Sequence, residues 1–142
     1  MKTCTRKAIY VTLLLTLLFT FAACDSQKNV SVWEKATYTE DTVLGSGSKT
    51  FTLVVQAEEK EVTFIVKTDK ETVGDALMEH NFISGEQGAY GLYVKIVNGI
   101  EADYNKTKSY WAFNENGKGL MTGVDGEKIT ENAHYELVYV KQ

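Results

Sequence analysis

Histidine and cysteine, the residues that most often act as metal ligands or nucleophiles, are scarce in this sequence. Its 142 residues include two of each, and His80 and His134 stand 54 positions apart with no second histidine or cysteine at ligand spacing. A zinc site needs such neighbours, so none is expected. A nucleophile elbow, a phosphate-binding loop and a dinucleotide fingerprint are also lacking. We therefore expect that the protein is not an enzyme and has no resident cofactor.

Two oxygen-rich loops, Asn114–Gly117 and Asp125–Glu127, are the remaining candidates for a cation. Neither has the spaced acidic series or the distal bidentate glutamate of a calcium-binding hand. The sequence therefore predicts no metal site, and a cation-binding domain is kept as the weaker alternative.

The first 24 residues have the pattern of a secretory signal. Three basic residues precede an apolar stretch, Ala8 to Ala23, whose 16 residues fall short of the ~20 that a membrane-spanning helix needs. The run Phe21-Ala22-Ala23-Cys24 resembles the lipobox of bacterial lipoproteins. That resemblance implies removal of residues 1–23, a diacylglyceryl thioether on Cys24 and an acylated amine, which together form a stable anchor. The alternative is an ordinary signal cut near Ala23 that leaves Cys24 as a free thiol.

The composition of the remaining chain limits its partners. Residues 24–142 number 119, enough for one domain, and carry a net charge of −7. Nucleic acid requires a basic face, so it is not an expected partner, and general adhesion to anionic headgroups is not expected either. With Cys4 removed and Cys24 lipidated, the folded part holds no cysteine and no disulfide.

Residues 24–48 are predicted to form the lipidated cysteine and a polar tether. The segment Asp25–Lys35 has Trp33 as its one large apolar residue, and Gly45-Ser46-Gly47-Ser48 has the composition of a flexible linker. In the alternative, Val30, Val32 and Trp33 add an edge strand.

Residues 49–142 are predicted to fold as an α+β domain. Alternating apolar residues indicate a hairpin of strands at 51–56 and 62–67, and Thr72 caps a helix that extends to His80. Further strands are expected at 92–97, 109–113 and 135–140, with a return strand starting at 120–122 and turns at 98–99, 114–117 and 125–127. One short helix packed across a mixed sheet is a β-grasp-like arrangement.

The same residues resemble the C-terminal domain of transcobalamin and intrinsic factor, a domain also found in largely uncharacterised bacterial proteins. The resemblance rests on Thr72–Leu77, on the run Gly91–Ile100 and on Tyr110-Trp111-Ala112-Phe113, followed by a glycine turn and Gly123-Val124. It implies a β-grasp-like fold and contact with cobalamin through the last hairpins. The helical domain that supplies much of the cobalamin contact in those carriers has no counterpart in this sequence.

A ligand-binding surface is expected around the tyrosine–tryptophan strand and the loops after it. On a strand, Trp111 and Phe113 share one face and Tyr110 lies on the other. An exposed pair beside Leu120 and Met121 would form an apolar platform for a flat ligand or a partner. The predicted ligand-binding residues are Tyr110, Trp111, Phe113, Asn116, Gly117, Leu120, Met121 and Val124. Core packing of the aromatic residues and a simple hairpin tip at Asn114–Gly119 are the alternatives.

Together these features predict a ligand-binding module on the extracytoplasmic face of the cell membrane, held by its lipid anchor. The expected ligand is a corrinoid or a similar small molecule, captured for uptake, and an envelope transporter is the expected protein partner. A cell-envelope interaction or structural domain without a small ligand is the alternative from a different class.

Overall fold

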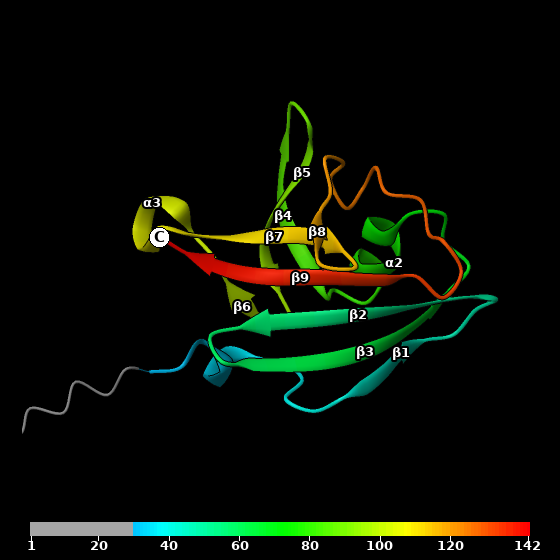
Figure 1. Ribbon diagram of the computed structural model, residues 1–142, viewed down its shortest axis with the longest axis horizontal. Helices are drawn as coiled ribbons and strands as arrows, with labels where there is room; N and C mark the ends of the chain where they lie inside the picture. The colour runs from blue at the N-terminus through cyan, green and yellow to red at the C-terminus, as the bar shows by residue number, and fades with distance from the viewer. Residues whose placement is uncertain (1–29) are drawn as a thin grey trace, which may run out of the picture.

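The computed structural model describes residues 30–142, so the predicted signal, Cys24 and the start of the predicted tether lie outside the described residues. Figure 1 shows the order of the elements along the chain. They are η1 (Val32–Lys35), β1 (Thr42–Gly45), β2 (Lys49–Ala57), β3 (Lys60–Thr68), α2 (Val73–Glu79), β4 (Ile83–Gly88), β5 (Gly91–Val97), β6 (Ile100–Glu101), α3 (Tyr104–Thr107), β7 (Ser109–Glu115), β8 (Lys118–Gly119) and β9 (His134–Lys141). None of the helices within residues 30–142 has the length and apolar character needed to cross a membrane.

A six-stranded mixed sheet forms the centre of the molecule, with the order β1-β3-β2-β9-β7-β8. The predicted β2–β3 hairpin is confirmed, and Leu53 pairs with Phe64 across it. Apolar residues alternate with polar ones along both strands, so one face of the hairpin is buried and the other is partly exposed. β9 inserts between β2 and β7, parallel to β2 and antiparallel to β7.

A second sheet of three antiparallel strands, β4-β5-β6, departs from the expected single sheet. Gly85 and Gly88 lie in β4 and are paired with β5. A β-bulge falls between Ser84 and Gly85, where a Cβ atom on Gly85 would lie 2.0 Å from the carbonyl oxygen of Tyr93. Only glycine fits so close to the neighbouring strand. The fold is therefore mostly β, with two sheets instead of one.

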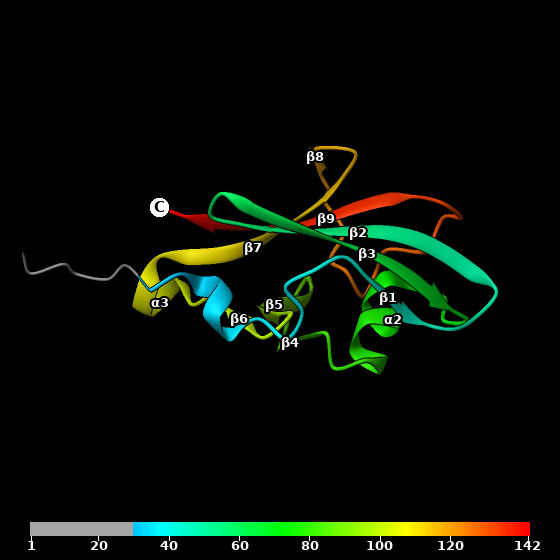
Figure 2. The same cartoon turned by 90° about the horizontal axis from the view of Figure 1, so that it is seen from below.

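The helices and the three-stranded sheet cover the same face of the large sheet. Seen from below, the helices and the β4–β5–β6 sheet lie on one side of it, while the β7–β8 turn projects from the other (Figure 2). The covered face holds the core, whose largest fully buried side chains are Tyr135, Phe51, Phe64, Leu53 and Leu77. Burial of these side chains, at ~1.5–3 kcal/mol each, supplies most of the stabilisation of a domain without disulfides.

Helix α2 begins where the sequence predicts. The hydroxyl of Thr72 accepts a hydrogen bond from the amide of Asp75 at 3.2 Å, which caps the first turn. Val73, Ala76 and Leu77 are buried and hold the helix against the sheet. The helix ends at Glu79, and His80 is its C-cap.

The predicted tether is wrong for its described part, because residues 31–48 are folded onto the domain. Trp33 is only 7% exposed, and its indole nitrogen donates a hydrogen bond to the carbonyl of Ala57 at 2.9 Å. β1 pairs in parallel with β3, so the edge strand lies at Thr42–Gly45 and not at Val30–Trp33. Between these elements, the buried side chain of Asn98 accepts from the amide of Tyr38 and donates to its carbonyl.

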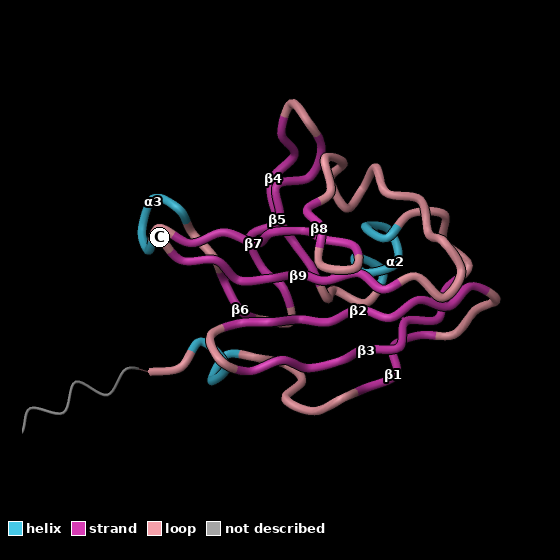
Figure 3. Tube along the Cα trace, in the orientation of Figure 1, coloured by secondary structure: helices cyan, strands magenta, loops and turns pink. Residues whose placement is uncertain are grey.

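The return strand after the β7–β8 turn is shorter than expected. Only Lys118 and Gly119 pair with β7, and a long loop then runs to β9 (Figure 3). Residues 120–122 belong to this loop and not to a strand.

Candidate functional site

Trp111 and Phe113 share one face of β7, as predicted, but that face is the core. Trp111 is 7% exposed and packs edge-on against Tyr139 with ring centroids 5.4 Å apart. Phe113 is half-buried and stacks on Tyr135 at 5.7 Å. Tyr110, on the opposite face of β7, is half-buried as well. The prediction of an open platform built on Trp111 is therefore wrong, and these aromatic residues pack in the core.

The predicted contact residues Asn116 and Gly117 form the tip of the β7–β8 hairpin. Both have a positive φ, of 49° and 76°, as this turn requires. The amide of Gly117 donates to the carboxylate of Glu136, at 2.9 Å to Oε1 and 3.1 Å to Oε2. Because the amide of Gly117 already has an acceptor, we interpret Asn116 and Gly117 as turn residues and not as ligand contacts.

The loop after β8 separates the remaining predicted residues. Leu120 is half-buried and its amide donates to the carbonyl of Phe113 at 3.0 Å, and Val124 is almost fully buried. Met121, between them, is fully exposed. A thioether side chain held entirely in water by two anchored neighbours suits contact with another molecule.

The tip of the β4–β5 hairpin carries a second exposed apolar group, which is not among the residues predicted from the sequence. Tyr90 is 98% exposed and Tyr93 is 45% exposed. The salt bridge between Lys95 and Glu86, on neighbouring strands of this hairpin, raises the pKa of the lysine through its hydrogen bond to the carboxylate. In Figure 1 the tip projects beyond β7 and β8, beside the loop that follows β8.

These two loops meet at glycines. A Cβ atom on Gly123 would lie 2.8 Å from Oδ1 of Asp125 and 3.7 Å from the carbonyl oxygen of Tyr90. A Cβ atom on Gly91 would lie 2.7 Å from the same carboxylate oxygen, and Gly91 has a φ of 111°. The carboxylate of Asp125 accepts a hydrogen bond from the amide of Leu92 at 3.0 Å. We call residues 89–93 and 120–125, joined in this way, the rim.

The rim is fastened to helix α2 as well. The amide of Gly74 donates to the carbonyl of Val124 at 2.7 Å, and the amide of Val73 donates to the carbonyl of Glu127 at 2.9 Å. A Cβ atom on Gly74 would lie 2.8 Å from the backbone of Asp125. The loop therefore rests directly on the start of the helix, and Tyr90 and Met121 project from a braced support.

The rim offers contact surface and the carboxylate of Asp125. Within residues 30–142, no three histidine, cysteine, aspartate or glutamate side chains come together as a metal site would require. A phenol ring, a thioether and backbone carbonyls are suited to cover a flat, partly apolar ligand or a protein surface.

Comparison with known proteins agrees with this fold. Residues 70–137 match a family described as "Domain of unknown function (DUF4430)", and this span contains α2 and the whole rim. No curated protein matches the sequence.

Solved structures with a similar fold include the following two. One is the crystal structure of a "putative metal binding protein" from Ruminococcus gnavus ATCC 29149, with a TM-score of 0.62 and 27% identity over 67% of this chain and 99% of that chain. The other is haptocorrin in complex with Cbi, with a TM-score of 0.54 and 18% identity over 69% of this chain. This chain spans about a quarter of haptocorrin, 26% of its length, and the likeness concerns the fold alone.

Proposed function

We propose that the protein is a lipid-anchored binding module on the extracytoplasmic face of the cell membrane, which presents the rim to a small ligand. The observation that carries the proposal is the placement of Tyr90 and Met121, two almost fully exposed apolar side chains, on adjoining loops that Asp125 braces. Exposed apolar groups on such a support cost free energy in water unless a ligand or partner covers them.

The support for the lipid anchor comes from the sequence. The lipobox-like run that ends at Cys24 supports lipidation there, and the basic and apolar leader supports export. Mass spectrometry of the natively produced protein tests this part. A diacylglyceryl thioether on Cys24 is expected, and a retained leader or an unmodified cysteine would refute it.

A corrinoid is the most specific ligand that we propose. Two observations support it: the resemblance of the sequence to the C-terminal domain of transcobalamin and intrinsic factor, and the similarity of the fold to haptocorrin, which was solved with Cbi. A corrinoid is large compared with the rim, and ligand sites usually enclose most of their ligand. We therefore expect a second protein, such as an envelope transporter, to cover the rest.

Titration of the detergent-solubilised full-length protein with cobalamin tests the ligand. Absorbance of the corrinoid and calorimetric heat are the appropriate signals, because Trp33 and Trp111 are both buried and do not report directly on an exposed surface. The variant Tyr90→Ser combined with Met121→Ser should weaken binding by about tenfold or more, a loss of ~1.4 kcal/mol. The matched control is Val43→Ser, an exposed apolar residue on β1. No heat at high-micromolar cobalamin would remove the corrinoid version.

Cation binding is the second candidate, favoured by the description of the Ruminococcus gnavus protein. A cation bound to the folded form raises the melting temperature by mass action. A melting temperature indifferent to calcium, zinc and chelator would exclude it. If neither ligand binds, capture of a defined envelope protein that is lost with Tyr90→Ser and Met121→Ser would favour the interaction module.

A further inference from the structure

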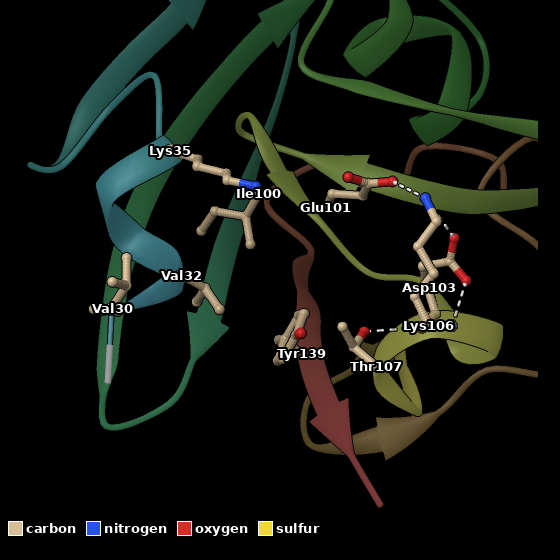
Figure 4. Close-up of a pocket in the computed structure, with 10 residues that line it drawn as sticks. Val30, Val32, Lys35, Ile100, Glu101, Asp103, Lys106, Thr107 and Tyr139 are labelled. Atoms are coloured by element: carbon tan, nitrogen blue, oxygen red, sulfur yellow. Dashed lines mark hydrogen bonds and ion pairs between the residues drawn. The ribbon is translucent and has the colours of Figure 1, made fainter. Parts of the chain in front are cut away.

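A groove lies at the end of the domain where the described chain begins. It has a volume of about 310 Å³ and runs between η1 on one side and α3 on the other. Val32, Ile100 and Tyr139 contribute its apolar lining, and its charged lining residues are Lys35, Glu101, Asp103 and Lys106. Figure 4 shows Tyr139 between the valines of the first wall and Thr107 of the second.

The chain reaches this groove directly from the proposed anchor. Val30 is 64% exposed and lines the groove, and only six residue steps separate it from Cys24. Six residues span at most ~20 Å when fully extended. Since the segment from Ser31 onward is folded onto the domain, the groove cannot lie farther than this from a lipidated Cys24.

The exposed residues around the groove suit a membrane surface. Tyr104 of α3 is 44% exposed, and the ammonium of Lys108 lies 4.9 Å from the centre of its ring. Tyrosine and lysine are typical of the headgroup layer, where the apolar part of the side chain enters the lipid and the polar tip stays in water. Lys35 has no carboxylate within ion-pair distance among the described residues, so its charge is free for a phosphate.

The charge of this end also distinguishes it from the rest of the domain. Residues 30–142 carry a net charge of −7, which opposes approach to an anionic leaflet. Among the residues that line the groove, Lys35 and Lys106 balance Glu101 and Asp103, so the lining is neutral. A neutral lining opposes approach to an anionic leaflet less than the acidic domain as a whole does.

We propose that the face formed by η1 and α3 lies against the lipid bilayer, and that the groove binds a phospholipid headgroup with its phosphate at Lys35. The proposal rests on the lipid anchor of the proposed function and not on the identity of the rim ligand. It fixes the orientation of the domain on the membrane, with Tyr104 toward the lipid and Tyr90 away from it.

Two exposed tyrosines provide a matched test in the full lipidated protein. The folded part has no cysteine, so Tyr104→Cys and Tyr90→Cys each offer a single site for a fluorescent label. In vesicles of phosphatidylethanolamine and phosphatidylglycerol with spin-labelled headgroups, the label at position 104 should be quenched several-fold more strongly than the label at position 90. Equal quenching at the two positions would overturn the proposal.

Two further variants separate headgroup binding from simple tethering. Insertion of about a dozen Gly/Ser residues after Asp25 lengthens the reach, and the quenching at position 104 should persist because the groove itself binds lipid. Lys35→Glu in the lengthened protein should reduce it, while Lys118→Glu on β8 should not. If the Gly/Ser insertion by itself abolishes the quenching at position 104, the headgroup site is refuted. Mass spectrometry of Cys24 shows whether a loss of quenching comes from a missing anchor instead of a missing headgroup site. Cobalamin titration tests the rim ligand and does not depend on the quenching results.

Discussion

The carboxylate of Asp125 accepts a hydrogen bond from the backbone amide of Leu92 at 3.0 Å, across 33 residues of sequence. This bond joins the loop that carries Met121 to the hairpin that carries Tyr90. The arrangement of the rim depends on it, because the two loops belong to different parts of the fold.

Removal of this acceptor should loosen the rim. Asp125→Ala leaves the amide of Leu92 without its acceptor in a half-buried place, which costs ~1–2 kcal/mol of the free energy of unfolding. We expect a lower urea midpoint and faster hydrogen exchange at Leu92. Asp125→Asn keeps an oxygen at the same place and serves as the control. Equal losses in the two variants would show that the hydrogen bond is not the cause.

A methyl group at position 123 should disturb the rim sterically. Its Cβ would lie 2.8 Å from Oδ1 of Asp125, whereas the Cβ of Gly126→Ala would lie 3.7 Å from the carbonyl oxygen of Gly123, an ordinary van der Waals contact. We expect Gly123→Ala to lower the free energy of unfolding by ~1–3 kcal/mol, as overpacking does, and Gly126→Ala to be nearly neutral. In an Asp125→Ala background the cost of Gly123→Ala should largely disappear. Additive effects in that double-mutant cycle would contradict a clash with the carboxylate.

The two tryptophans should respond differently to the same substitution. Both are 7% exposed, but the indole nitrogen of Trp33 donates to Ala57, while that of Trp111 is buried without a partner among the described residues. Trp33→Phe removes a hydrogen bond and leaves a carbonyl without its donor, and Trp111→Phe removes an unsatisfied donor. We expect Trp33→Phe to be the more destabilising by ~1–2 kcal/mol in urea denaturation. The reverse order would mean that Trp111 has a hydrogen-bond partner in solution.

Acid should weaken the turn between β1 and β2. The amide of Ser48, and then its hydroxyl, donate to Asp69 and hold the pKa of that carboxyl below its usual value. A carboxyl whose pKa is lower in the folded state stabilises the fold above its unfolded pKa of about 3.9, and this contribution is lost as the pH falls through the folded value. The melting temperature should therefore fall less between pH ~5 and ~2 in Asp69→Asn than in the parent. Glu59→Gln, in an exposed turn, should keep the slope of the parent protein.

The elements that the sequence predicts well are those with local signals. The alternation in β2, β3 and β9 and the Thr72 cap are visible within a few residues, and all of these elements form as expected. β4 carries no such signal, because Ser84-Gly85-Glu86-Gln87-Gly88 has no apolar residue and acquires its strand conformation from pairing with β5. The burial of Trp33 likewise depends on Ala57, which is distant in sequence.

The candidate site was harder to predict than the fold. β7 has aromatic residues whose alternation says which side chains share a face, but not which face the core occupies. Met121 belonged to the expected site and is exposed at the rim, whereas Tyr90, which is also exposed there, was not among the predicted residues. Gly88 and Gly91 on either side of a tyrosine are a signal that could have indicated an exposed hairpin tip.

The position of β9 between β2 and β7 has a consequence for how the domain folds. The two halves of the large sheet have no ladder between them until residues 134–141 are available, so the core cannot close before this strand has been made. Pairings between segments so distant in sequence form slowly. Under the export proposed above, a chain that folds in this way would still be open when it is threaded through the channel.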